Sequence, residues 1–223
     1  MSELVVIVPS RNRPHAAAEL AEAFRETCTA DTELRVVVDR DDPTAGLYPE
    51  PKIVGGHTSM VDALNREALV AAQGSQRPAA IGFQGDDHRP RTKGWDQAYL
   101  DALADLGTGI VYGNDLLQGE KIPTQCAMTA DIVRTLGYMA PPDLVHLYVD
   151  NAWLALGRAL GRITYLPDVV VEHLHPVAGK AEWDEGYARV NDPGMYDRDR
   201  MAFERWLRQS LPAEVHRLRR IAQ

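Results

Sequence analysis

The sequence contains only two cysteines, Cys28 and Cys126, and no apolar run long enough to cross a membrane. Two cysteines do not make a disulfide framework, so nothing in the composition points to an oxidising compartment. Residues 1–8 lack a basic stretch and pass directly into an aliphatic run, which is not typical of a signal peptide. We therefore expect a cytoplasmic protein without a membrane segment.

Positive charge is also scarce. The 24 lysines and arginines are outnumbered by 32 aspartates and glutamates, which gives a net charge of −8. General nucleic-acid binders and membrane-surface binders usually carry a basic face, so this balance argues against both classes. It does not exclude a nucleotide ligand, because phosphates need only a local positive site. The length of 223 residues and the hydrophobic content of 45% suit one domain with a full core.

Apolar runs alternate with amphipathic stretches in the first half of the chain. Residues 4–8 and 34–38 are aliphatic runs typical of buried parallel strands, and residues 16–27 between them have a helical period. This order implies a β-α-β unit with a right-handed crossover. The same pattern predicts strands at 53–54, 79–83 and 110–112, and helices at 59–73 and 94–106. The fold class is therefore α/β, with a mostly parallel central sheet flanked by helices.

The second half is less regular. It predicts an extended piece at 124–128, helices at 129–136 and 148–160, and strands at 163–165 and 169–171. Residues 179–193 have no clear period, whereas 197–209 and 213–221 form a charged pair of helices. No linker divides the chain, so we predict a single domain, residues 1–223, with a C-terminal helical appendage.

The most informative stretch is the predicted strand 79–83 and the acidic turn that follows it. The strand ends in Asp86, Asp87 and His88. Adjacent carboxylates repel each other unless a positive group lies between them, and oxygen ligands with an imidazole suit Mg²⁺ or Mn²⁺. Ligands of open α/β sheets collect at the carboxyl ends of strands. The turn is therefore a candidate metal and phosphate site; the alternative is a solvated turn in which Asp86 caps the next helix.

Two further strand ends carry polar residues. The loop 9–14 joins a strand to a helix and contains Arg11 and Arg13, a combination that favours an anion; two solvated arginines are the alternative. It is not glycine-rich, which disfavours a dinucleotide fold. Asp39 ends the second strand and could accept a hydrogen bond from a nucleobase, or could simply be a turn residue. Asp41 and Asp42 are interpreted as solvated charges.

Taken together, these motifs resemble the GT-A glycosyltransferases, most closely the inverting family 2 type. The resemblance spans residues 4–173 in order and spacing. It rests on residues 5–14 (Val-Val-Ile-Val-Pro-Ser-Arg-Asn-Arg-Pro), the aspartate at 39, and residues 83–88 (Phe-Gln-Gly-Asp-Asp-His). It continues in residues 148–153 (Tyr-Val-Asp-Asn-Ala-Trp), 161–167 (Gly-Arg-Ile-Thr-Tyr-Leu-Pro) and 169–173 (Val-Val-Val-Glu-His).

The resemblance implies a nucleotide-binding half at about 1–112, an acceptor-side half at about 113–178, and a helical tail at about 179–223. It places Asp87 and His173 as ligands of Mn²⁺ or Mg²⁺ and Asp150 as the catalytic base. It assigns contacts with the nucleotide-sugar to Pro9, Ser10, Arg11, Asn12, Arg13, Asp39, Asp86, Asp87 and Trp95.

Two features depart from the family pattern. The acidic motif reads Gly-Asp-Asp-His, so Asp86, Asp87 and His88 remain alternatives for the direct metal ligand. The acceptor helix begins Val149-Asp150 where the family often has Glu-Asp, so the base assignment depends on Asp150 alone. His175 shares a strand face with His173, but only His173 aligns with the family's final strand.

The resulting expectation is a metal-dependent transferase that moves a sugar from a nucleotide-diphospho-sugar to a hydroxyl acceptor with inversion. A UDP-sugar is favoured because Asp39 can accept from uracil N3–H, although guanine offers donors too. The acceptor and the oligomeric state are open, and Tyr148 is a weaker acceptor-side candidate. The alternatives are a metal-dependent hydrolase or nucleotidyltransferase acting on a nucleotide-sugar, and a non-catalytic sugar-nucleotide-binding module.

Overall fold

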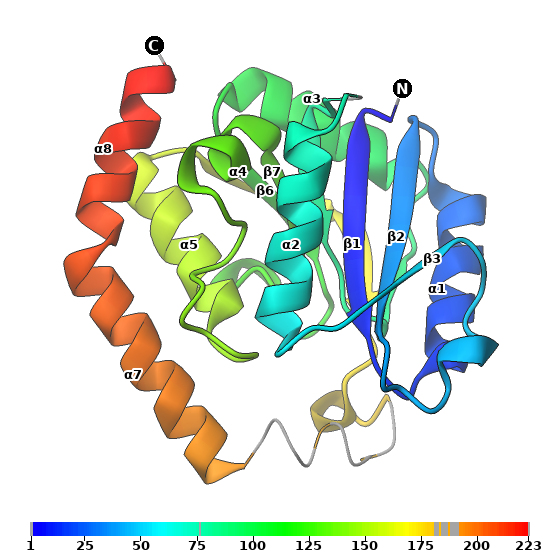
Figure 1. Cartoon of the computed structure of the whole chain (residues 1–223). Helices are drawn as coiled ribbons and strands as arrows, with labels where there is room; N and C mark the ends of the chain where they lie inside the picture. The colour runs from blue at the N-terminus through cyan, green and yellow to red at the C-terminus, as the bar shows by residue number, and fades with distance from the viewer. Residues whose placement is uncertain (1, 76, 181–182, 184–186, 188–191, 223) are drawn as a thin grey trace.

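The computed structural model describes residues 2–75, 77–180, 183, 187 and 192–222 (Figure 1). Within these residues, eight strands form one sheet in the order β3-β2-β1-β4-β7-β6-β8-β5. The strands are β1 (Leu4–Ser10), β2 (Thr32–Asp39), β3 (Lys52–Gly55), β4 (Ala80–Phe83), β5 (His88–Pro90), β6 (Ile110–Asn114), β7 (Cys126–Thr129) and β8 (Ile163–His173).

Helices cover both faces of the sheet. On one face, α1 (Pro14–Thr27) and α3 (Trp95–Leu106) pack over a core centred on β1 and β4. The other face is covered by α2 (Met60–Gln73), α4 (Ala130–Leu136), α5 (Val149–Leu160), α7 (Pro193–Gln209) and α8 (Leu211–Ile221). This three-layer α/β arrangement is the predicted fold class.

The strand directions confirm the mostly parallel sheet and correct some details, since four strand pairings of the described residues are parallel and three are antiparallel. β1, β2, β3 and β4 run parallel, as does β8 beside β6. β7 is antiparallel to both β4 and β6, so it joins the two parallel sets. The strands expected at 163–165 and 169–171 are a single long strand, β8, and β5 is a short strand that the sequence pattern did not predict. β1 also continues through Pro9 to Ser10, two residues beyond its expected end.

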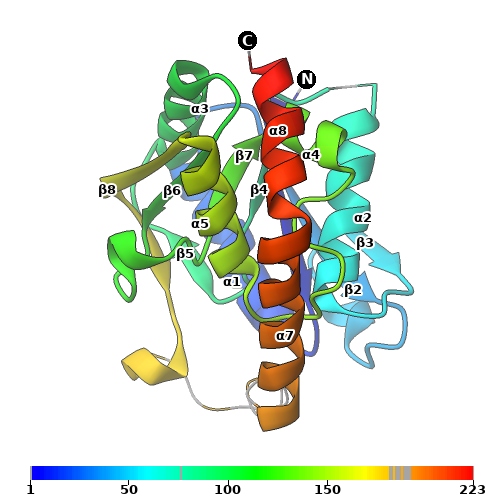
Figure 2. The ribbon, with the colours of Figure 1, turned by 90° about the vertical axis from the view of Figure 1, so that its left-hand side faces the viewer.

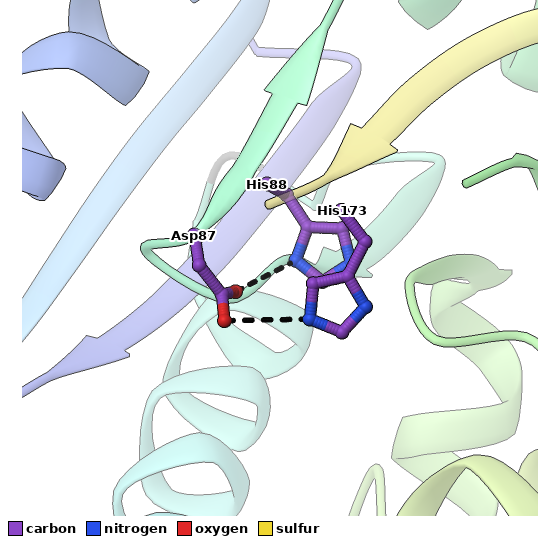
Figure 3. Close-up of side chains that lie close together, drawn as sticks. All are labelled: Asp87, His88 and His173. Atoms are coloured by element: carbon purple, nitrogen blue, oxygen red, sulfur yellow. Dashed lines mark hydrogen bonds and ion pairs between the residues drawn. The ribbon is translucent and has the colours of Figure 1, made fainter. Parts of the chain in front are cut away.

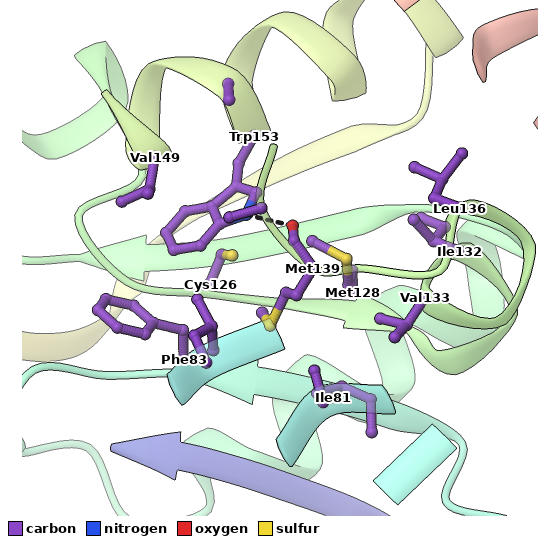
Figure 4. Packing of buried hydrophobic residues seen from close by; sticks show 14 of the residues in the cluster. Ile81, Phe83, Cys126, Met128, Ile132, Val133, Leu136, Met139, Val149 and Trp153 are labelled. Carbon is purple, nitrogen blue, oxygen red and sulfur yellow. Dashed lines mark hydrogen bonds between the residues drawn. The ribbon is translucent and has the colours of Figure 1, made fainter. Parts of the chain in front are cut away.

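The larger core lies between the sheet and the α5 layer. Figure 4 shows Trp153 of α5 above the sheet, close to Phe83 at the end of β4; their ring centroids are 5.2 Å apart. The indole Nε1 of Trp153 donates to the backbone oxygen of Met139 at 2.9 Å, so the buried polar atom is satisfied. This packing anchors the first turns of α5 next to the end of β4, where the acidic turn begins.

The C-terminal helices form a long rod against the layer of α2, α4 and α5 (Figure 2). The strongest polar link is Asp199 of α7, whose side chain is fully buried. Its Oδ1 accepts the backbone N–H of Val145 at 3.1 Å, and its Oδ2 accepts those of His146 at 2.9 Å and Leu147 at 2.7 Å. One carboxylate on α7 thus fixes the segment that leads into α5.

We expect Asp199→Ala to lower the free energy of unfolding by about 2–4 kcal/mol, because it leaves three backbone N–H groups without their charged acceptor. Guanidinium titration of the variant measures this loss. Asp197→Ala is the matched control, since Asp197 lies on the same helix, is mostly exposed and pairs only with Arg200 among the described residues. The control should change stability by less than about 0.5 kcal/mol. Equal losses in the two variants would contradict the role given to Asp199.

Candidate active site

The candidate site lies at the carboxyl end of β4, where the chain makes a tight turn into β5. Gly85 is required in this turn, because a Cβ at that position would lie 2.5 Å from Oδ1 of Asp87. β5 pairs antiparallel with β8 so that His88 lies directly opposite His173. The backbone N–H of Leu174 also donates to the oxygen of Asp87 at 2.9 Å. The long strand β8 therefore brings His173 to the acidic turn.

Asp87, His88 and His173 form a compact cluster of metal-binding atoms (Figure 3). One ligand atom from each lies within 4.8 Å of the others. Oδ1 of Asp87 is 3.4 Å from Nδ1 of His88, and Oδ2 is 3.3 Å from Nε2 of His173. The two imidazoles stack with their centroids 4.3 Å apart. A carboxylate beside imidazole nitrogens suits a divalent cation such as Mn²⁺.

The two histidines are not equivalent. Nδ1 of His88 accepts the backbone N–H of Gly85 at 2.9 Å, and its Nε2 lies 3.5 Å from Oγ1 of Thr124. His88 therefore has a structural role in the turn. His173 faces Asp87 through Nε2, and its buried Nδ1 has no hydrogen-bond partner among the described residues. The donor set thus fits a cation held by Asp87 and His173, with His88 as a neighbour.

The pKa values of the two adjacent aspartates, Asp86 and Asp87, are shifted in opposite directions. Burial acts to raise the pKa of Asp87, but hydrogen bonds and charge from His173 and His88 outweigh it and hold the pKa well below its usual range. Burial and the charge of Asp87 raise the pKa of Asp86 to about 6, against the opposing effects of Arg13 and Ser10. Asp87 is therefore the residue that carries the negative charge needed by a metal.

Asp86 connects the turn to the loop after β1. Ser10 donates from Oγ to Oδ2 of Asp86 at 2.5 Å, and Nη1 of Arg13 lies 3.3 Å from Oδ1. Tyr48 joins this group through its hydroxyl, which accepts the backbone N–H of Arg13 at 3.0 Å and lies 3.2 Å from Oγ of Ser10. The predicted residues Ser10, Arg13 and Asp86 therefore form one connected polar group, in which Ser10 and Asp86 are buried.

Arg11 and Asp39, two further predicted nucleotide-binding residues, pair with each other, and Arg11 also pairs with Asp41. Nη1 of Arg11 lies 3.0 Å from Oδ2 of Asp39 and 2.7 Å from Oδ1 of Asp41. The other oxygen of Asp39 lies 3.0 Å from Nδ1 of His57. Asp39 is thus already paired on both oxygens, although about a quarter of its side chain stays exposed. Pro9 lies inside β1 rather than in a loop.

Asp42 corrects the interpretation of this region. It is buried rather than solvated, and its carboxylate accepts the backbone N–H of Asn12 at 2.8 Å and that of Thr44 at 2.7 Å. Asn12 itself has a positive φ of 60°, a left-handed conformation that asparagine adopts more readily than most other residues except glycine. Asp42 therefore fixes the conformation of the loop that follows β1.

Asp150 lies in the first turn of α5. Burial raises the pKa of its carboxylate, while the backbone N–H of Asn151, which donates to Oδ1 at 2.8 Å, and the charge of His173 act in the opposite direction. A buried carboxylate whose pKa is raised is a candidate functional group, and the predicted role of Asp150 as a base stays a prediction here. The sequence predicted Asp150 near the start of this helix. The charge of His173 influences the pKa of Asp150, which relates Asp150 to the cluster of Asp87, His88 and His173.

Not every predicted residue reaches the site. Trp95 is only 1% exposed and packs in the core between Phe24 and Tyr99, with ring centroids 5.2 and 5.3 Å away. This burial corrects the expectation that Trp95 contacts the sugar. Conversely, Tyr187 was not predicted: its hydroxyl donates to Oδ2 of Asp87 at 2.7 Å, and the guanidinium of Arg13 lies 4.1 Å from its ring centroid. It falls in residues 179–193, where the sequence has no period.

Comparison with known proteins identifies the architecture. No protein-family model matches the sequence, and no curated protein sequence does. The chain has the GT-A fold, the α/β architecture of nucleotide-diphospho-sugar glycosyltransferases. One similar structure is mannosyltransferase PcManGT from Pyrobaculum calidifontis in complex with GDP-Man and Mn²⁺, with a TM-score of 0.61 and 17% identity over 98% of this chain and 73% of that one.

Another similar structure is TarS 1–349 from S. aureus in complex with UDP-GlcNAc. Its TM-score is 0.56, with 13% identity over 92% of this chain and 71% of that one. At these identities the likeness concerns the fold.

A separate finding is that no described helix has both the length and the apolar character needed to span a membrane.

The geometry predicts that His173→Ala weakens Mn²⁺ binding by at least about tenfold, because His173 faces Asp87 directly. His175→Ala should have a smaller effect, since Nδ1 of His175 accepts the backbone N–H of Val177 at 3.2 Å. Calorimetric titration with Mn²⁺ compares the variants, and His216→Ala, on the exposed face of α8, is the control. A greater loss for His175→Ala would show that the wrong histidine was chosen.

Proposed function

We propose that this protein is a metal-dependent glycosyltransferase that moves a sugar from a nucleotide-diphospho-sugar to a hydroxyl acceptor with inversion. The observation that carries the proposal is the cluster of Asp87, His88 and His173 at the carboxyl end of β4, on a GT-A fold in which the charge of His173 influences Asp150. The similar structures with GDP-Man and Mn²⁺ and with UDP-GlcNAc support this class of donor.

In the proposal, residues 1–112 bind the nucleotide and residues 113–178 face the acceptor. The loop Pro9, Ser10, Arg11, Asn12 and Arg13 lines the donor, and Arg13 provides positive charge for phosphate. Asp39 interacts with the base, which favours a UDP-sugar and leaves a GDP-sugar possible. Because Arg11 and His57 already hold the Asp39 carboxylate, base binding requires one of these partners to share it or move.

Asp87 and His173 hold the cation, either Mn²⁺ or Mg²⁺, and Asp86 contacts the ribose. When bound, the cation neutralises charge on the diphosphate leaving group. Ser10 and Arg13 keep Asp86 in place through the contacts at 2.5 and 3.3 Å. The protein thus separates two tasks between neighbouring carboxylates, in keeping with their opposite pKa shifts.

Asp150 acts as the general base. The acceptor oxygen attacks the anomeric carbon as the bond to the diphosphate oxygen breaks, and the acceptor proton passes to the Asp150 carboxylate. The nucleoside diphosphate leaves with the bonding electron pair. One displacement from the opposite face inverts the anomeric centre and needs no covalent sugar–enzyme intermediate. A raised pKa brings the carboxylate closer to neutral pH, where proton transfer is more favourable.

Donor binding is the first test of the proposal. We expect UDP to bind in the presence of Mn²⁺ and to bind much more weakly without it, because the phosphates and carboxylates then repel each other. Asp87→Ala should also weaken binding, because it removes a proposed ligand of the metal. Calorimetry with UDP, GDP, CDP and dTDP ranks the nucleotides. Metal-independent binding that is equal in wild type and variant would contradict the metal assignment, and a clear preference for GDP would overturn the uridine assignment.

Asp150→Asn tests the catalytic step. The change keeps the size of the side chain but removes its ability to take a proton, so transfer should slow about 10²–10⁴-fold while donor binding persists. Product analysis should show inversion for the wild type. Near-normal turnover by Asp150→Asn, or retention of configuration, would show that Asp150 is only a helix-start charge. Sugar release that needs no acceptor would favour the alternative of a nucleotide-sugar hydrolase.

A further inference from the structure

Tyr148 has an unusual conformation directly before the helix that bears Asp150. Its φ of 64° and ψ of 7° lie in the left-handed region, which is unfavourable for a bulky residue. Such a conformation persists only where the surrounding structure enforces it, and it is frequent at ligand sites. Here the enforcing group is Asp199 of α7, which binds the three preceding backbone N–H groups.

The same helix surrounds Tyr148 with aromatic rings. The ring of Phe203 stacks on Tyr148 at a centroid distance of 5.5 Å and an interplanar angle of 26°. Tyr196 meets Tyr148 edge to face at 5.6 Å and 76°. Phe203 in turn stacks on the buried Trp206 at 6.1 Å. The rings form a continuous row from the core to the surface, and we call Tyr148 and Tyr196 the aromatic platform.

The outer part of the row is open. Tyr196 is 49% exposed and Tyr148 is partly exposed. The hydrogen bonds of the described residues include none to either hydroxyl. A tyrosine presents an apolar face together with a polar tip, and these two hydroxyls are available to a ligand. The beginning of α7 lies at the end of the molecule where β1 and β2 finish, which is the end that carries the candidate site (Figure 1).

We propose that the aromatic platform binds the acceptor, and that the acceptor is a neutral saccharide. This inference rests on the proposed function, because it concerns the second substrate of the same reaction. A sugar ring has an apolar C–H face that packs on a tyrosine ring and hydroxyls at its edge that pair with tyrosine hydroxyls. Tyr148 directly precedes α5, whose first turn carries Asp150, so the platform adjoins the end of the helix that bears the proposed base.

The charges around the platform favour a neutral ligand over an anionic one. The charged groups that influence Tyr148 are Arg200, Glu204 and Asp197, which together carry one net negative charge. Arg200 is already bound, since its Nη2 lies 3.2 Å from Asp197 and its Nη1 lies 3.3 Å from Glu204. No unpaired cation among these three groups is therefore available for a phosphate or a carboxylate of an acceptor.

The experiment uses the full chain and saturation-transfer NMR with a defined panel. The panel contains the methyl glycosides of glucose, galactose, mannose and N-acetylglucosamine, cellobiose, and as non-sugar probes adenosine and glycerol 3-phosphate. We expect at least one sugar to receive saturation on its C–H face. In Tyr196→Ala its affinity should fall about tenfold, while Tyr196→Phe keeps most of the binding because the ring remains.

Met201→Ala is the matched control, since Met201 is exposed on the same helix outside the platform and should leave sugar binding unchanged. Thermal unfolding of the variants verifies that Tyr196→Ala is folded. If no sugar of the panel binds, or if sugar binding is indifferent to Tyr196, the proposal is overturned. It is also overturned if adenosine or glycerol 3-phosphate is the probe that depends on Tyr196.

Calorimetry with UDP and GDP in the presence of Mn²⁺ separates this result from the proposed function. Nucleotide binding without Tyr196-dependent sugar binding would remove the platform and leave the transferase assignment standing. Sugar binding that depends on Tyr196 without any nucleotide binding would support the platform and overturn the transferase assignment.

Discussion

The fold depends on buried carboxylates that are satisfied mainly by backbone N–H groups. Asp199 holds the segment before α5, Asp96 accepts from the backbone of Thr29 and Ala30, and Asp115 accepts from those of Leu117, Gln118 and Gly119. Each side chain is at most 1% exposed. A buried charge is costly unless it is well hydrogen-bonded, so each of these aspartates stabilises one particular loop conformation and penalises the others. Acidic residues outnumber basic ones in this chain, and some of the acidic residues are buried and stabilise loops.

The candidate site also contains two aspartates, but their partners are of a different kind. Asp86 and Asp87 are held mainly by side chains, among them those of Ser10, Arg13, His173 and Tyr187. Side-chain partners can exchange for a ligand, whereas backbone partners in a loop are fixed. The pKa values of the pair move in opposite directions, as expected where two carboxylates share a confined space and different partners. The buried aspartates that bind backbone N–H groups thus keep fixed partners, whereas Asp86 and Asp87 in the candidate site can exchange their side-chain partners for a ligand.

Local patterns predicted the elements, whereas long-range pairing determined the details of the site. The aliphatic runs at 4–8 and 34–38 and the acidic turn at 86–88 located the sheet and the carboxyl edge, because period and strand ends are local properties. The position of His88 opposite His173 depends on β8, and the nearness of Tyr187 to Asp87 depends on a segment 100 residues away; no local pattern reports either. Trp95 illustrates the converse: an aromatic residue after an acidic turn suits a sugar site, but its helix packs against Phe24 and encloses it.

The pairing of β5 with β8 also sets the order in which the site can form. Asp87 and His173 are 86 positions apart, and the loop between them includes β6, β7, α4 and α5. Closing so long a loop is slow compared with local events, and it must wait until β8 has left the ribosome during synthesis. The loop after β1 is held by Asp42, Tyr48 and Asp86, which all precede β8 in the chain, so these contacts can form before His173 reaches Asp87. During synthesis the loop after β1 can therefore form before the Asp87–His173 pair, and α7 and α8, which follow β8, pack onto the domain later still.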